Sequence, residues 1–407
     1  MLYQAYQLYF DALLPARGLA RLGLSAVTPL LPPGGASWLN NFTAACELIA
    51  RAGLSHTRPP FGIETVRAGN RDVAVTEEPL AATPFGTLLH FKKDLEQEQP
   101  RVLLVAPLSG HFATLLRHTV RTLLADHDVC ITDWHNARDI ARASGRFGFD
   151  GYVEHLIQWL RILGPGTHLV AVCQPCVQAL AAAATPAAGR CADAARPRSL
   201  TLMAGPIDTR ISPTRVNRLA TEKPIEWFES NLISTVPSRY KGAGRRVYPG
   251  FVQLLAFLSM NIGRHRKAHM DLYRHLASGN VEKAEEIKDF YDEYFAVLDM
   301  CAEFYLETVE WVFQQARLAK GTLTFRGARV KPAAIRGTVL LTVEGERDDI
   351  CGIGQTAAAH DLCAGLRPYL KHHHLQPGAG HYGVFSGKRW ENQIYPQVRH
   401  AILAAHR

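Results

Sequence analysis

Short runs rich in Val, Ile and Leu recur along this chain of 407 residues, and stretches with helical spacing separate most of them. Continuous apolar runs that alternate with helices are typical of an α/β fold, with a mostly parallel central sheet and helices on both faces. The first three runs have the character of an antiparallel lead-in. The predicted strands are residues 62–67, 72–75, 87–92, 102–106, 128–132, 168–172, 200–204, 338–343 and 372–376.

This alternation stops between residues 206 and 330, where helical spacing and many aromatic side chains take over. We interpret 206–330 as a helical cap, or lid, inserted into a core made of 61–205 and 331–407. Residues 1–60 form a predicted N-terminal helical extension. Its aromatic stripe, which includes Tyr6, Tyr9 and Phe10, fits packing against the main domain better than adhesion to a hydrophobic surface.

Composition excludes several classes of protein. Hydrophobic residues make up 47% and charged residues 20%, which is ordinary for a globular chain. The net charge of +8 comes from scattered basic residues, so we expect no nucleic-acid partner. No window approaches the ~18 uncharged apolar residues of a membrane span, and no transmembrane segment is expected. The N-terminus lacks a basic region of the secretory type, so we expect a cytoplasmic protein whose eight cysteines are mostly buried thiols.

One cysteine stands where a predicted strand meets a predicted helix. Cys173 follows the run 168–172 directly, and helical spacing begins at Cys176. Strand, sharp turn and helix make up a nucleophile elbow, in which small residues flank the nucleophile because strand and helix crowd it. Ala171 and Pro175 occupy those flanking positions. The helix N-terminus would favour a thiolate at Cys173, although a buried structural cysteine is an equally good interpretation of this segment alone.

Two distant segments favour the functional interpretation. The run 340–343 leads into Gly345 and then Asp348, an acid on the loop after a late strand. His381 lies between glycines after the last predicted strand. Nucleophile, acid and histidine in this order are characteristic of the α/β-hydrolase fold. We therefore predict a triad of Cys173, Asp348 and His381, preferring Asp348 to the adjacent Asp349 only because of its spacing from Gly345.

The turn after the run 102–106 is the predicted second half of an oxyanion hole. In this fold one backbone N–H comes from that turn and another from the residue after the nucleophile. The predicted donors are Gln174 together with Ser109 or its neighbour Leu108. A plain strand-to-helix turn would have a similar sequence.

Cys173 and Cys176 also form a C-x-x-C pair, which is typical of a dithiol redox protein. A thioredoxin-like unit is much smaller than this chain and would leave Asp348 and His381 unexplained. A zinc site is disfavoured because no second cysteine pair accompanies the first. The run His372, His373 and His374 would point to alternate faces of a strand, so no metal site is expected there.

Several segments together resemble intracellular polyhydroxybutyrate (PHB) depolymerases, a family of α/β-hydrolases with a cysteine nucleophile. The resemblance extends from Met1 to the C-terminal region. The segments that carry it are 1–4, 106–117, 131–134, 172–175, 342–346 and 380–385. Cys176 departs from the family pattern, and its spacing from Cys173 raises the hypothesis of a reversible, inactivating disulfide. Loss of activity under mild oxidant that persists in Cys176→Ser would contradict that hypothesis.

The resemblance implies hydrolysis of ester bonds in intracellular poly(3-hydroxybutyrate). Cys173 would form an acyl-thioester, His381 would act as the base, Asp348 would orient it, and no metal or organic cofactor would take part. The implied partner is the polymer or its granule surface, the implied location is cytoplasmic on storage granules, and a homodimer stays open. The alternatives are a polyhydroxyalkanoate synthase-like acyltransferase, the dithiol redox protein, and a catalytically silent granule coat. Polymer side-chain preference, endo or exo cleavage and the substrate-binding residues are not predicted.

Overall fold

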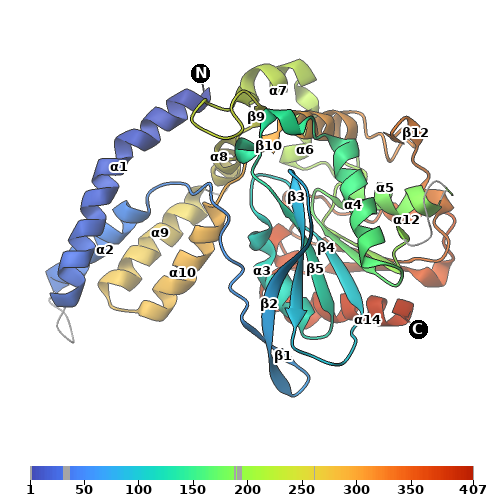
Figure 1. Ribbon diagram of the computed structural model, residues 1–407, viewed down its shortest axis with the longest axis horizontal. Helices are drawn as coiled ribbons and strands as arrows, with labels where there is room; N and C mark the ends of the chain where they lie inside the picture. The colour runs from blue at the N-terminus through green and yellow to red at the C-terminus, as the bar shows by residue number, and fades with distance from the viewer. Residues whose placement is uncertain (1, 31–36, 188, 190–194, 261, 407) are drawn as a thin grey trace.

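The computed structural model describes residues 2–30, 37–187, 189, 195–260 and 262–406. Its centre is a nine-stranded sheet (Figure 1). The strands are β1 (Thr65–Ala68), β2 (Arg71–Ala82), β3 (Gly86–Lys93), β4 (Arg101–Val105), β5 (Asp128–Trp134), β6 (His168–Val172), β7 (Ser199–Met203), β13 (Val339–Gly345) and β14 (Lys371–Gln376). They lie in the order β1-β2-β3-β5-β4-β6-β7-β13-β14.

The predicted α/β class is confirmed. All pairs from β5 to β14 are parallel, whereas the pairs β1–β2, β2–β3 and β3–β5 are antiparallel. The second strand is longer than predicted, because β2 continues to Ala82 through an irregularity between Pro79 and Ala81. A proline lacks an N–H for the ladder, and a bulge lets the strand continue past it.

Helices cover both faces of the sheet. One face packs against α4 (Phe149–Leu163) and α5 (Cys176–Ala187). The other packs against α3 (Arg117–Leu124) and α14 (Tyr395–His406). Strands β4 and β6 are buried along almost their whole length, as expected for central strands with helices on both sides. This rigid centre holds the segment that follows β6.

The chain between β7 and β13 is mostly helical. It contains a three-stranded sheet and a short hairpin besides its helices. The elements are α6 (Arg215–Glu222), α7 (Ile225–Leu232), β8 (Ser234–Thr235), β9 (Arg246–Tyr248), α8 (Gly250–Met260), α9 (Ile262–Ala277), α10 (Val281–Tyr294), β10 (Met300–Cys301), α11 (Ala302–Glu307), a π-helix (Thr308–Gln314), β11 (Thr324–Phe325) and β12 (Ala328–Arg329). The short helices α12 (Ala359–Leu362) and α13 (Gly387–Arg389) lie later in the chain. Our division into core, cap and extension remains an interpretation.

Helical spacing alone does not set where one of these helices ends. The pattern continues from residue 281 to 300, but α10 ends at Tyr294. The reason is tertiary: Ala296 and Val297 form bridges with Ser55 and His111, so their backbone groups bond to distant segments.

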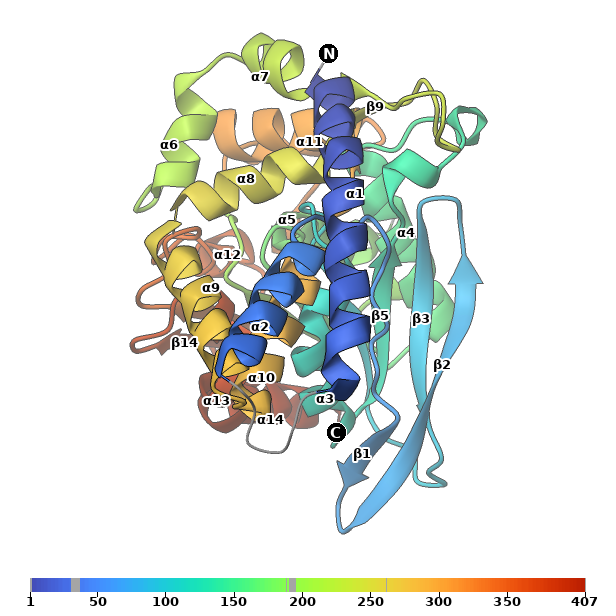
Figure 2. The same ribbon diagram turned by 90° about the vertical axis from the view of Figure 1, so that its left-hand side faces the viewer.

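The N-terminal helices α1 (Leu2–Val27) and α2 (Ser37–Arg51) form a side lobe with α9 and α10 (Figures 1 and 2). Tyr3 is buried, and Tyr6 stacks on Phe251 at 3.9 Å between ring centroids. Tyr9, by contrast, is 63% exposed, so only part of the aromatic stripe packs as predicted. Among the described residues, none of the helices has both the length and the apolar character of a membrane span.

Candidate active site

Cys173 sits on a strained turn between β6 and α5. Its φ is +66°, an unusual value for a residue other than glycine, and its N–H donates to the Met203 carbonyl at 2.7 Å. Gly205 permits this close packing, because a Cβ added there would lie 2.2 Å from the Cβ of Cys176. The sequence therefore folds locally as a nucleophile elbow, and the backbone presents the Cys173 side chain at the carboxyl edge of the sheet.

The structure brings the three residues of the predicted triad together. His381 Nε2 lies 3.1 Å from Cys173 Sγ, and His381 Nδ1 lies 2.7 Å from Asp348 Oδ2. The other carboxylate oxygen, Oδ1, accepts the N–H groups of Ile350 at 2.9 Å and Cys351 at 2.8 Å. Asp348 is therefore fixed at both oxygens, whereas the adjacent Asp349 is exposed to solvent.

The imidazolium form of His381 is favoured in this arrangement. Burial alone would lower the pKa of His381, but the Asp348 carboxylate and the Cys173 sulfur raise it well above the usual value for histidine. In the imidazolium form both ring nitrogens donate, one to the carboxylate and one to the sulfur. A positive ring at 3.1 Å stabilises a thiolate electrostatically.

The predicted oxyanion donors lie beside the sulfur. Leu108, Ser109 and Gln174 line the same cavity as Cys173. The Leu108 N–H donates to the side-chain oxygen of Gln174 at 3.4 Å. Within the described part of the chain, the backbone N–H groups of Ser109 and Gln174 have no acceptor. Unpaired N–H groups next to a nucleophile can receive the oxygen of a carbonyl under attack.

The cavity has a volume of about 640 Å³ and a mostly apolar wall. Its floor is formed by the turn residues named above and by His381. Its remaining wall comes largely from the helical segment between β7 and β13. The aromatic residues of that segment that line it are Trp227, Phe228, Tyr248, Phe257, Phe304, Tyr305 and Phe313. The sequence left substrate-binding residues unassigned, although the excess of aromatics in this segment was the available signal.

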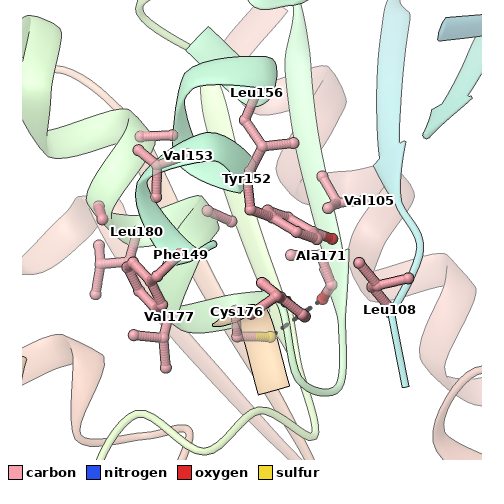
Figure 3. Packing of buried hydrophobic residues seen from close by; sticks show 14 of the residues in the cluster. Val105, Leu108, Phe149, Tyr152, Val153, Leu156, Ala171, Cys176, Val177 and Leu180 are labelled. Carbon is pink, nitrogen blue, oxygen red and sulfur yellow. Dashed lines mark hydrogen bonds between the residues drawn. The ribbon is translucent and has the colours of Figure 1, made fainter. Parts of the chain in front are cut away.

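Cys176 lies apart from this cavity. Its side chain is fully buried among Leu108, Tyr152 and Val177 (Figure 3), and its thiol donates to the Ala171 carbonyl at 3.4 Å. Burial raises the pKa of the Cys176 thiol well above its usual value. Cys173 and Cys176 are both free thiols. A dithiol redox site needs a second thiol that can ionise and exchange, so this geometry does not favour one.

The other described cysteines are buried and free, as expected: Cys46, Cys130, Cys301, Cys351 and Cys363. Cys191 falls outside the described residues. No cluster of three His, Cys, Asp or Glu side chains suited to a metal ion occurs in the described ranges. In β14, His373 hydrogen-bonds to Thr342 Oγ1 at 2.9 Å and His374 to Gln376 at 3.0 Å, which are structural contacts.

The structural role of one buried carboxylate, that of Glu344, was not predicted from the sequence. Glu344 is the penultimate residue of the buried strand β13, and its Oε1 accepts the N–H groups of Thr356 at 2.7 Å and Ala357 at 3.0 Å. Its Oε2 accepts the Gly354 N–H at 2.9 Å. Glu344 thereby fastens the loop that follows Asp348. The signal was a glutamate within an otherwise apolar strand, since a buried carboxylate needs several donors.

The family model described as PHB de-polymerase C-terminus matches residues 204–406. That range contains Asp348, His381 and most of the cavity wall. This chain belongs to the PHB depolymerase family. The match agrees with the family resemblance of the N-terminal segments described above. A search of curated proteins gave no match.

Several solved structures are similar in fold. The α/β hydrolase GrgF from Penicillium sp. sh18 is 14% identical with a TM-score of 0.46, covering 82% of this chain and 97% of that one. A carboxylesterase structure from Nitrososphaera gargenis is 11% identical with a TM-score of 0.39, covering 84% and 99%. A meta-cleavage product hydrolase from Pseudomonas fluorescens IP01 is 15% identical with a TM-score of 0.40, covering 84% and 95%.

Proposed function

We propose that this chain hydrolyses the ester bonds of poly(3-hydroxybutyrate) through a Cys173–His381–Asp348 triad. The observation that carries the proposal is the continuous contact from Cys173 Sγ to His381 Nε2 at 3.1 Å and from His381 Nδ1 to Asp348 Oδ2 at 2.7 Å. Membership of the PHB depolymerase family supports the substrate class.

In the acylation step the Cys173 thiolate attacks the ester carbonyl carbon. The carbonyl oxygen becomes an oxyanion and accepts the N–H groups of Gln174 and of the Leu108–Ser109 turn. Within that turn, the Leu108 N–H can take part only if the Gln174 side-chain oxygen, to which it now donates, moves away. Collapse of the tetrahedral adduct expels the alkoxide, which takes the Nε2 proton of His381, and an acyl-thioester remains on Cys173.

In the deacylation step neutral His381 accepts a proton from water while the water oxygen attacks the thioester. The oxyanion forms in the same hole, and its collapse releases a 3-hydroxybutyrate oligomer or monomer and the Cys173 thiolate. Asp348 keeps Nδ1 protonated throughout and stabilises the imidazolium. The apolar cavity wall gives a water-insoluble chain a surface to bind.

The test is clearing of an amorphous polyester emulsion together with hydrolysis of a soluble p-nitrophenyl ester. Cys173→Ala should abolish both activities, and brief incubation of the wild type with soluble ester should add one acyl mass to the peptide that contains Cys173. Cys363→Ser, at a buried thiol away from the cavity, is the matched control and should keep both activities.

The proposal would be contradicted if the protein still cleared the polyester emulsion after complete alkylation of Cys173. Release of CoA from hydroxybutyryl-CoA with polymer growth, without acid release from polymer, would instead support the acyltransferase. Emulsion binding by wild type without any clearing would support the granule coat.

A further inference from the structure

Helix α1 has an apolar face on each side. The inner face packs through Tyr3 and Tyr6 against the rest of the chain. The outer face, which we call the outer seam, is in contact with solvent along the helix, which runs in front of the molecule in Figure 2. The outer seam consists of Ala5, Leu8, Ala12, Pro15, Leu19, Leu22 and Ala26, all of them exposed.

The spacing of the outer seam is regular. Successive members are alternately three and four residues apart over the whole helix. This alternation aligns side chains along one line and is the pattern by which one helix packs against another. Leu8, Leu19 and Leu22 are 71%, 70% and 66% exposed, so nothing in the described chain covers it. A solvated helix face would carry polar residues at these positions.

The flanks of the outer seam favour a second helix over a flat apolar or lipid surface. Helices that lie on such surfaces carry large apolar residues on one face and many Lys and Arg on the other. Here three of the seven seam residues are alanine, and Gly18 and Gly23 lie beside the seam. Asp11 is the single charged residue at the positions directly flanking the seam. Apart from Tyr9 and Asp11, the flanking residues are small or uncharged, which lets two helix backbones approach closely.

We propose that α1 packs antiparallel against α1 of a second copy of this chain along the outer seam. In that arrangement Leu8 faces the partner's Leu19, Ala12 faces the partner's Pro15, and Ala5 faces the partner's Leu22. Two-fold symmetry makes each pairing occur twice, so one seam is complementary to itself. Small residues oppose larger ones in two of the three pairings, which fills the interface without overlap.

The contact is small for a protein–protein interface. A 26-residue helix spans ~39 Å at about 1.5 Å per residue. One helix pair buries less than the ~800 Å² per partner of a standard interface. The neighbouring helix α2 has further exposed apolar residues: Trp38, Phe42 and Ile49 are 70%, 45% and 47% exposed. We expect a reversible dimer with a Kd on the order of 1 μM.

The test is sedimentation equilibrium of the full chain from about 0.5 to 100 μM under reducing conditions, a range that brackets the expected Kd. The double variant Leu8→Glu, Leu19→Glu places like charges opposite each other and should raise the Kd at least ~10-fold, about 1.4 kcal/mol. Leu14→Glu is the matched control, because Leu14 is 55% exposed on α1 but lies off the seam. The control should dimerise as the wild type does.

If the circular dichroism and the soluble-ester activity of the double variant and of Leu14→Glu equal those of the wild type, both variants fold correctly. A wild-type monomer at 100 μM, or a double variant that dimerises as strongly as the control, would overturn the proposal. A wild-type monomer whose adsorption to polyester emulsion is lost only in the double variant would also overturn it and would assign the seam to the polymer. None of these outcomes bears on the triad, which soluble-ester activity reports separately.

Discussion

Asp348 and Asp349 are adjacent in sequence, but their surroundings differ completely. Asp348 touches His381 and accepts two backbone N–H groups, whereas Asp349 faces solvent. A neutral amide at 348 would no longer stabilise the imidazolium and could stabilise the wrong tautomer of the ring. Asp348→Asn should therefore lower kcat on a soluble ester about 10²- to 10⁴-fold, while Asp349→Asn should leave it within about twofold. Equal losses in the two variants would remove Asp348 from the triad.

The ion pair between Asp348 and His381 makes the free energy of unfolding depend on pH. Since the folded-state pKa of His381 lies above its unfolded value of about 6.5, the ion pair stabilises the fold fully below that pH. This contribution is lost as pH rises through the raised folded-state pKa. The difference in free energy of unfolding between wild type and Asp348→Asn should thus be larger at pH 6 than at pH 10. Urea unfolding at both pH values measures this difference in free energy. A difference that grows with pH would contradict the ion pair between Asp348 and His381.

At the scale of elements, the elbow depends on how closely β7 approaches the start of α5. Gly205 leaves no room for a Cβ, which would meet the Cβ and Sγ of Cys176 at 2.2 and 2.3 Å. Gly205→Ala should destabilise the fold by roughly 1–3 kcal/mol and lower activity, because Cys173 must shift. Gly337→Ala is the control, since a Cβ there has no atom within 4 Å. Thermal unfolding and ester hydrolysis of both variants test this, and equal Tm values would refute it.

One buried hydrogen bond helps to anchor α1. Tyr3 OH donates to Asp299 Oδ2 at 2.7 Å, and the Gly250 N–H donates to the other oxygen at 2.9 Å. Burial raises the pKa of Asp299 to about 6, so the carboxylate is charged above that pH and needs its donors.

Tyr3→Phe should therefore cost about 1–3 kcal/mol at pH 8 and less at pH 5, where Asp299 is largely protonated. Tyr9→Phe changes an exposed ring and should cost nothing measurable. Urea unfolding at both pH values gives the comparison, and a pH-independent cost would show that Asp299 does not respond as described.

At the scale of the whole molecule, folding makes one sulfur accessible and hides the others. Cys173 lines the cavity and is partly exposed, whereas the other six described cysteines are buried, including Cys351, which also borders the cavity. Brief iodoacetamide treatment of native protein should modify Cys173 far faster than those six, and unfolded protein should label all eight cysteines. Peptide mass mapping gives the sites. Rapid labelling of Cys176 in native protein would contradict the packing in Figure 3.

Much of the architecture could be predicted locally. Central strands β4 and β6 are recognisable because burial on both faces demands continuous apolar runs. The end of α10 at Tyr294 could not be predicted, because bridges to Ser55 and His111 override helical spacing. The length of β2 was missed because the predicted run ends at Val75, before Glu77 and Glu78, whereas pairing with β3 continues past Pro79 through a bulge.

For the candidate site, the sequence alone determined the residue types and their order: a cysteine at a strand–helix turn, then an acid, then a histidine. It could do so because each follows a strand, and parallel strands bring their carboxyl ends to one edge. Only the tertiary structure decided that Asp348 rather than Asp349 reaches His381, that Cys176 faces away, and that helices between β7 and β13 close an apolar cavity over Cys173. Side-chain direction and the docking of a long insertion depend on contacts between distant segments, which local spacing does not encode.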